Sequence, residues 1–174
     1  SSYVSTGVAD ESGVNETMKN YALEGVEFSF VKVADIVQFT ESTADNRTDN
    51  HVEVLYAIDK VQGADFLKAL GLENGANCYQ NADQMDSSKY FYQSDVLIHA
   101  LSAALTANST VVKNAMEQYI AAIGGTAMPL TDSFGKTKAE NLTLGLYLIV
   151  ETKVPENVVS TTDPFLISLP MTSV

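Results

Sequence analysis

Few side chains in this sequence could act as a nucleophile, a general base or a metal ligand. Its only histidines are His51 and His99, and its only cysteine is Cys78. A cysteine and a histidine could form a nucleophilic pair, but no local motif joins Cys78 to either histidine. The sequence also lacks a glycine-rich phosphate loop, a nucleophile elbow and the spacing of a zinc site. We therefore expect a protein that is not an enzyme and that binds neither a metal nor a cofactor.

One carboxylate, Glu151, has an unusual position. It directly follows the apolar run from Leu144 to Val150, whose alternation predicts a strand, and it shares a strand face with Tyr147. The carboxylate therefore either ends the strand and points to water, or is a buried acid with a chemical task. A buried acid without a partner would cost several kcal/mol of stability, so the second alternative requires a partner nearby.

The charge of the chain limits the partners that it can have. Its 22 acids and 10 bases give a formal net charge of -12 and a pI near 4.3. Nucleic acids and anionic membranes are bound by basic surfaces, so neither is an expected partner. No apolar run approaches the roughly 18 residues that a transmembrane helix requires, so we expect no membrane insertion.

The strands and helices that must position these residues follow from the spacing of apolar side chains. Alternation predicts strands over residues 26–33, 51–58, 126–130, 143–152 and 163–169. Helical spacing predicts a short helix over residues 64–70 and two longer helices separated by a break at Asn108, the second of which ends at Gly124. Residues 39–50 are expected to form a polar connection between the first two strands.

The order of these elements predicts a single domain of mostly β structure. Strands come first, helices follow and strands return, which favours an antiparallel sandwich with a helical insertion over residues 64–125. Residues 1–22 show no sustained period and are expected to form an extended arm or a long loop. The 174 residues suffice to bury a core within one such domain.

The segment around Glu151 resembles the E-box of Gram-positive pilins, which has roughly the pattern Y-x-L-x-E-T-x-A-P. The matching residues are Tyr147, Glu151, Thr152 and Pro155. Ile149 and Val154 are conservative departures from the leucine and the alanine of the pattern. Residues 25–33 resemble the family's G-x-x-F-x-x-x-K-V strand, and residues 162–172 resemble the strand that follows the E-box. The resemblance thus covers nearly all of the chain beyond the arm.

The resemblance implies an immunoglobulin-like β-sandwich of the collagen-adhesin B type. It further implies a structural shaft subunit of a covalently polymerised pilus, secreted and anchored to the cell wall of a Gram-positive bacterium. The implied partners are neighbouring pilin subunits, joined by a sortase, and ancillary pilins. The alternative is an adhesin or ancillary module that binds a host or surface ligand, for which the aromatic cluster of Tyr90, Phe91 and Tyr92 is the candidate patch.

In the family, a lysine on the first strand and an asparagine on the last strand can condense to an isopeptide bond while the E-box glutamate shuttles protons. The resemblance implies that shuttling role for Glu151. The lysine and the asparagine are not among the matched positions: Lys32 lies on the wrong strand, and the last strand is expected beyond Thr172. We therefore expect a fragment that lacks edge strands and that contains no internal isopeptide bond.

Overall fold

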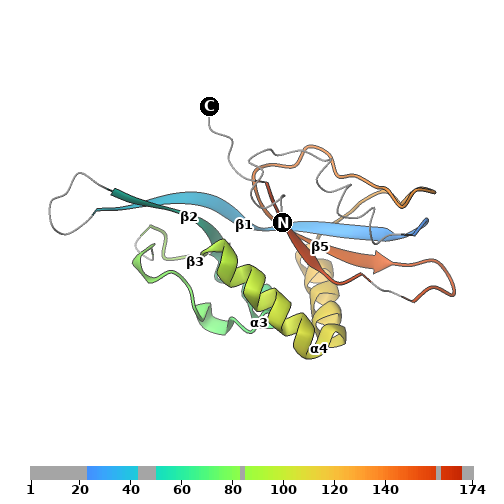
Figure 1. Cartoon of the computed structure of the whole chain (residues 1–174), viewed down its shortest axis with the longest axis horizontal. Coiled ribbons are helices and arrows are strands. Elements are labelled where there is room, and N and C mark those ends of the chain that lie inside the picture. Colours follow the sequence, from blue (N-terminus) through green and yellow to red (C-terminus); the bar gives the residue numbers. More distant parts are fainter. Residues whose placement is uncertain (1–22, 43–49, 83–84, 160–161, 170–174) are drawn as a thin grey trace.

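A long central strand, β1, organises the sheet (Figure 1). The computed structural model describes residues 23–42, 50–82, 85–159 and 162–169. Its strands are β1 (Glu27–Ser42), β2 (Asn50–Asp59), β3 (Lys89–Tyr92), β4 (Thr126–Ala127), β5 (Gly145–Lys153) and β6 (Phe165–Leu169). They form one antiparallel sheet in the order β3-β2-β1-β5-β6, and β4 also pairs with β1. The first half of β1 pairs with β5 and the second half with β2, so β1 belongs to both parts of the sheet.

Strand β1 extends further than the alternation of its side chains predicts. The expected polar connection over residues 39–50 is wrong at its start, because β1 continues to Ser42. Phe39 pairs with Glu53 of β2, and its ring packs 5.9 Å from the ring of Tyr79. Pairing with β2 and this aromatic contact therefore hold a polar stretch of chain in a strand.

The helical layer consists of α3 (Ala64–Ala69) and α4 (Ser94–Ile123). Asn108 within α4 has non-helical backbone angles, φ -164° and ψ 92°, and Figure 1 shows the two halves of the helix pointing in different directions. The side-chain oxygen of Asn108 accepts the backbone N–H of Val111 at 3.2 Å and so caps the second half. The predicted break at Asn108 is confirmed.

By length and composition alone, α4 is the one helix among the described residues that could cross a membrane. The bend at Asn108 divides its 30 residues into halves that are each shorter than the about 20 residues of a spanning helix. Leu97, Met116 and Ile120 of α4 are buried in the core beneath the helix. These features are those of a helix that packs one face on the core of a globular domain.

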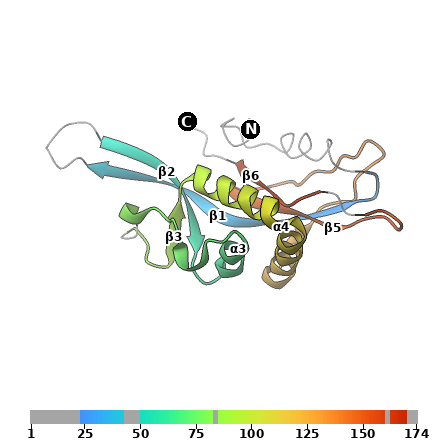
Figure 2. The same ribbon diagram turned by 60° about the horizontal axis from the view of Figure 1, so that its bottom comes forward.

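Strand β5 shows how the sheet separates two layers. Its side chains alternate, so that Leu146, Leu148 and Val150 face α3 and α4, whereas Tyr147 and Ile149 face the opposite side. Figure 2 shows both helices on the same side of the sheet, and the loop between β4 and β5 packs on the other. The predicted fold class is confirmed: the chain is mostly β with a helical insertion, an arrangement consistent with an immunoglobulin-like sandwich.

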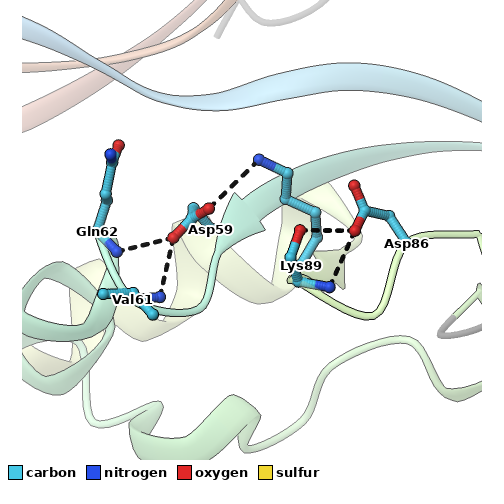
Figure 3. A network of polar contacts seen from close by, with 6 residues as sticks. Asp59, Val61, Gln62, Asp86 and Lys89 are labelled. Atoms are coloured by element: carbon cyan, nitrogen blue, oxygen red, sulfur yellow. Dashed lines mark hydrogen bonds and ion pairs between the residues drawn. The ribbon is translucent and has the colours of Figure 1, made fainter.

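Strand β3 lies within the predicted helical insertion, and a polar network fixes the turns around it (Figure 3). The Asp59 carboxylate accepts the backbone N–H groups of Val61 at 2.9 Å and of Gln62 at 2.8 Å. It also lies 3.6 Å from the ammonium of Lys89 on β3. Asp86 accepts the N–H at 2.9 Å and the hydroxyl at 2.6 Å of the serine two residues further on. These hydrogen bonds lower the pKa of both carboxyl groups.

Candidate functional site

Glu151 is a buried carboxylate on β5. It lies opposite Phe28 of β1, and only 6% of its surface is exposed. Of the two positions that the sequence leaves open for this carboxylate, the structure therefore shows the buried one. Directly paired residues share a face of the sheet, so Glu151 borders the apolar cluster that includes Phe28, Tyr147 and Ile149. Glu151 also has an interaction with another part of the protein.

A chain of hydrogen bonds joins β1 to β5 beside Glu151. The Thr152 hydroxyl donates to the Glu27 carboxylate at 2.7 Å, and the Ser29 hydroxyl lies 2.9 Å from the same Thr152 oxygen. A hydroxyl carries one proton, so Thr152 accepts from Ser29 when it donates to Glu27. The Glu27 carboxylate also lies 3.7 Å from the Lys153 ammonium. We call the residues Glu27, Ser29, Thr152 and Lys153 the β1–β5 clamp.

The clamp has a buried part and a solvent-exposed part. Ser29 is buried and the Glu27 side chain is 16% exposed, whereas the Lys153 side chain is 73% exposed. The hydrogen bond from Thr152 to Glu27 is charge-assisted, and such bonds are about twice as strong as neutral ones. The ion pair of Lys153 faces water and contributes little. The clamp therefore depends mainly on its two hydroxyl groups and the carboxylate.

The other two residues that the resemblance singles out lie at the ends of β5. The Tyr147 hydroxyl donates to the backbone carbonyl of Thr143 at 2.6 Å, which fixes the chain just before the strand begins. Pro155 follows the strand, and its Cγ lies 3.4 Å from the point where a Cβ on Gly25 would be. Gly25 has a φ of +81°, a conformation that favours glycine, so the approach to β1 passes close to Pro155.

Lys32 lies away from Glu151 along β1. It pairs with Tyr147, four residues before Glu151 on β5, and four residues of strand span about 13 Å. Its ammonium lies 3.4 Å from the carboxylate of Asp35, which is further along β1 in the direction away from Phe28. The geometry therefore does not make Lys32 an amine partner of Glu151.

The histidines and the cysteine lie in separate elements. His99 is exposed on α4, where its Nδ1 lies 2.9 Å from the backbone oxygen of Asp95. Cys78 is half-buried in a loop, with its sulfur 3.4 Å from the amide nitrogen of Gln80. His51 lies in β2, and its side chain is outside the described part of the structure. Among the described residues, no group of three or more His, Cys, Asp or Glu side chains is placed to hold a metal ion.

Of the four clamp residues, the sequence singles out only Thr152. Glu27 and Ser29 alternate with Phe28 and have the appearance of an ordinary polar strand face. Their link to Thr152 depends on which strands are neighbours and in which register, and no local pattern encodes either. One usable signal is the opposite charge of Glu27 and Lys153, which the register places across from each other.

A comparison with models of known protein families bears on the whole chain. The model of the family described as Gram-positive pilin subunit D1, N-terminal domain, matches residues 2–174. The comparison with curated proteins and the comparison with solved structures gave no match. The matched segment includes both strands of the β1–β5 clamp and both helices, so the match spans all of the elements described above.

Proposed function

The chain belongs to the family of N-terminal D1 domains of Gram-positive pilin subunits, and on that premise we propose that it forms part of the structural shaft of a covalently polymerised pilus. Membership makes it part of a subunit that associates with other pilin subunits in a pilus at the cell surface. The proposal adds that a sortase joins the subunits, that ancillary pilins are further partners, and that the pilus is secreted and anchored to the cell wall.

The observation that carries this proposal is the family match over residues 2–174. The β1–β5 pairing supports it, because a shaft subunit must keep its strands together under tension. Two long antiparallel strands pair from residues 27 to 34 and from 146 to 153, and the clamp adds side-chain hydrogen bonds to that ladder. We also propose that residues 1–174 form one domain, with residues 1–22 as an arm and residues 64–125 as an insertion.

Within this role, we propose that Glu151 is the proton-shuttling acid of an E-box that Tyr147, Thr152 and Pro155 complete. A carboxylic acid between an amine and an amide can take a proton from the attacking nitrogen and give one to the amide oxygen. The burial of Glu151 beside an apolar layer supports the proposal, because such a site excludes water from the proton transfer. The amine and the amide would come from positions outside the matched motif.

The candidate binding patch of the adhesin alternative is not a surface patch. In the aromatic cluster, Phe91 and Tyr92 are buried. Tyr90 is half-buried, and the Lys60 ammonium lies 4.8 Å above the centre of its ring. These side chains belong to the packing around β3 instead of forming a binding patch. A shaft role is therefore the function that the observations favour, in a family of structural subunits and not of enzymes.

The test is carried out in the bacterium that makes the protein. Cell-wall extracts are separated in denaturing gels and probed with an antibody against this domain, in wild-type cells and in cells without the pilus sortase. A shaft subunit gives a ladder of covalent polymers that disappears with the sortase, and immunogold particles along the whole fibre. Labelling confined to the fibre tip or base would indicate an ancillary subunit. Fibres that persist after deletion of this protein would refute the proposal.

A further inference from the structure

Asn74 is the one asparagine of the chain that directly precedes a glycine. It is exposed, whereas Gly75 is buried. Asn–Gly is the dipeptide most prone to spontaneous deamidation, because glycine has no side chain to hinder attack by its own backbone nitrogen. The pair therefore has the residue types of a chemical modification site.

The backbone conformation of Asn74 recurs elsewhere in the molecule. Four non-glycine residues in the described part of the chain have a positive φ, and all four are exposed asparagines: Asn74, Asn77, Asn141 and Asn157. Asparagine adopts this left-handed conformation more readily than most L-residues. The other three precede cysteine, leucine and valine, so Gly75 distinguishes Asn74 from sites of the same conformation. These sites are internal controls for the effect of the glycine.

Hydrogen bonds close the turn around Asn74, which lies in the short 3-10 helix η1 (Glu73–Gly75). The Ala76 N–H donates to the Glu73 carbonyl at 3.1 Å, across Asn74. The Cys78 N–H donates to the Gly75 carbonyl, also at 3.1 Å. The backbone on both sides of the asparagine is therefore held in place.

Two aromatic side chains of β3 pack on the same turn. A Cβ on Gly75 would lie 2.3 Å from Cε1 of Tyr90, so the glycine backbone packs directly on the ring. The Tyr92 hydroxyl donates to the Ala76 carbonyl at 2.8 Å. Strand β3 thus fixes the backbone that follows Asn74.

Deamidation begins with a new bond between the two neighbouring residues. The backbone nitrogen of Gly75 attacks Cγ of Asn74, the bond from Cγ to Nδ2 breaks, and ammonia leaves with the proton of the Gly75 N–H. Water then opens the cyclic imide at either carbonyl and gives aspartate or isoaspartate. The imide requires the Gly75 nitrogen to lie beside Cβ of Asn74, and at the observed ψ of 30° this nitrogen is rotated away from Cβ. The folded turn therefore prevents the reaction until it opens locally.

We propose that Asn74 is a modification site, at which water converts the amide to isoaspartate and aspartate, and that the packing of Gly75 on Tyr90 controls the rate. Either product adds a negative charge beside Glu73. Isoaspartate also inserts a carbon atom into the backbone, where Gly75 is already packed against the ring. The modified turn should therefore lose its contacts with β3. The proposal holds whether or not the chain forms a pilus shaft.

The first experiment follows the purified chain during storage at mildly alkaline pH, folded and in urea. Peptide mapping by mass spectrometry, with a separation that resolves isoaspartate from aspartate, measures the modified fraction at Asn74, Asn141 and Asn157. In urea we expect Asn74 to react at least about tenfold faster than the other two, and folding should slow it by about tenfold. Equal rates at the three sites in urea, or equal rates at Asn74 with and without urea, would overturn the proposal.

The second experiment tests the role of packing. Tyr90→Ala removes the ring on which Gly75 packs, so it should speed the modification of Asn74 by about tenfold and leave that of Asn157 unchanged. Tyr90→Phe keeps the ring and is the matched control, and circular dichroism checks that both variants fold. If Tyr90→Ala does not fold, Tyr90→Leu takes its place. The same rate at Asn74 with and without the ring would refute the control by packing.

The third measurement follows the consequence for the fold. During the same storage, the melting temperature of the wild-type chain should fall as isoaspartate accumulates at Asn74. Asn74→Gly suits the left-handed turn and has no amide to lose, so its melting temperature should stay constant. An equal fall in both proteins would show that modification of Asn74 does not disturb the turn, contrary to the proposal.

Discussion

Thr152 carries a single hydroxyl that serves several neighbours at once. It donates to the Glu27 carboxylate, accepts from Ser29, and lies 3.3 Å from the Glu27 backbone oxygen. Ser29 is buried, so water cannot easily replace a partner that it loses. Glu151, one residue away, depends on the same stretch of β5 for its position opposite Phe28. At the scale of single residues, the side-chain hydrogen bonds of the clamp thus all involve one atom, the hydroxyl oxygen of Thr152.

We expect Thr152→Val to lower the free energy of unfolding by about 1–3 kcal/mol, because the valine keeps the shape but leaves Ser29 and Glu27 without their partner. Urea unfolding followed by circular dichroism measures the change. Thr40→Val is the matched control, since Thr40 is an exposed threonine on the neighbouring strand β1, outside the clamp, and valine suits strands. Its effect should stay within about 0.5 kcal/mol. Similar losses for the two variants would contradict the clamp.

At the scale of elements, the bend at Asn108 divides α4 into two halves, each of which contributes buried side chains to the same core cluster. Asn108 leaves the helical conformation and caps the half that begins after it. We expect Asn108→Ala to lower the free energy of unfolding by about 1 kcal/mol, since a cap is lost. Asn114→Ala, at an exposed helical position, should instead be neutral or raise it by up to about 0.5 kcal/mol, because alanine has the higher helix propensity.

Thermal unfolding followed by circular dichroism distinguishes these two asparagines. The prediction requires that the changes in the free energy of unfolding differ clearly, or have opposite signs, for two chemically identical substitutions in one helix. If both variants gained stability, Asn108 would be an ordinary helical residue, and the bend would have another cause.

The hydrogen-bonded carboxylates in the turns around β3 should make the stability of the fold depend on pH. Hydrogen bonds lower the pKa of Asp59 and Asp86 below the ordinary value of 3.8. A carboxyl group whose pKa is lower in the folded state stabilises the fold above its unfolded-state pKa, and this contribution is lost as the pH falls through the folded value. We therefore expect the melting temperature to fall as the pH drops from about 5 to below 3.8. The double variant Asp59→Asn, Asp86→Asn should lose part of that dependence, and an unchanged dependence would contradict the network.

For the whole molecule, the sequence predicts those features that a local pattern encodes. The run from Leu146 to Val150 is continuously apolar, and the strand there is observed where it is expected. The polar end of β1 escapes prediction because pairing with β2, and not its own composition, makes it a strand. The clamp could not be predicted from the sequence for the same reason. Ser29 and Thr152 meet only through the register of two strands that lie more than 100 residues apart in sequence.

The placement of the lysines on β1 and β5 leads to the last prediction. We expect the intact mass of the chain to equal the mass calculated from its sequence. An isopeptide bond would lower the mass by one ammonia and would require a lysine with a neutral amine beside Glu151. Lys32 is paired with Asp35 along β1, and Lys153 is largely exposed and lies near Glu27. Electrospray mass spectrometry of the denatured chain measures the mass. A deficit of one ammonia that Glu151→Gln abolishes would contradict the prediction and would show that Glu151 acts within this chain alone.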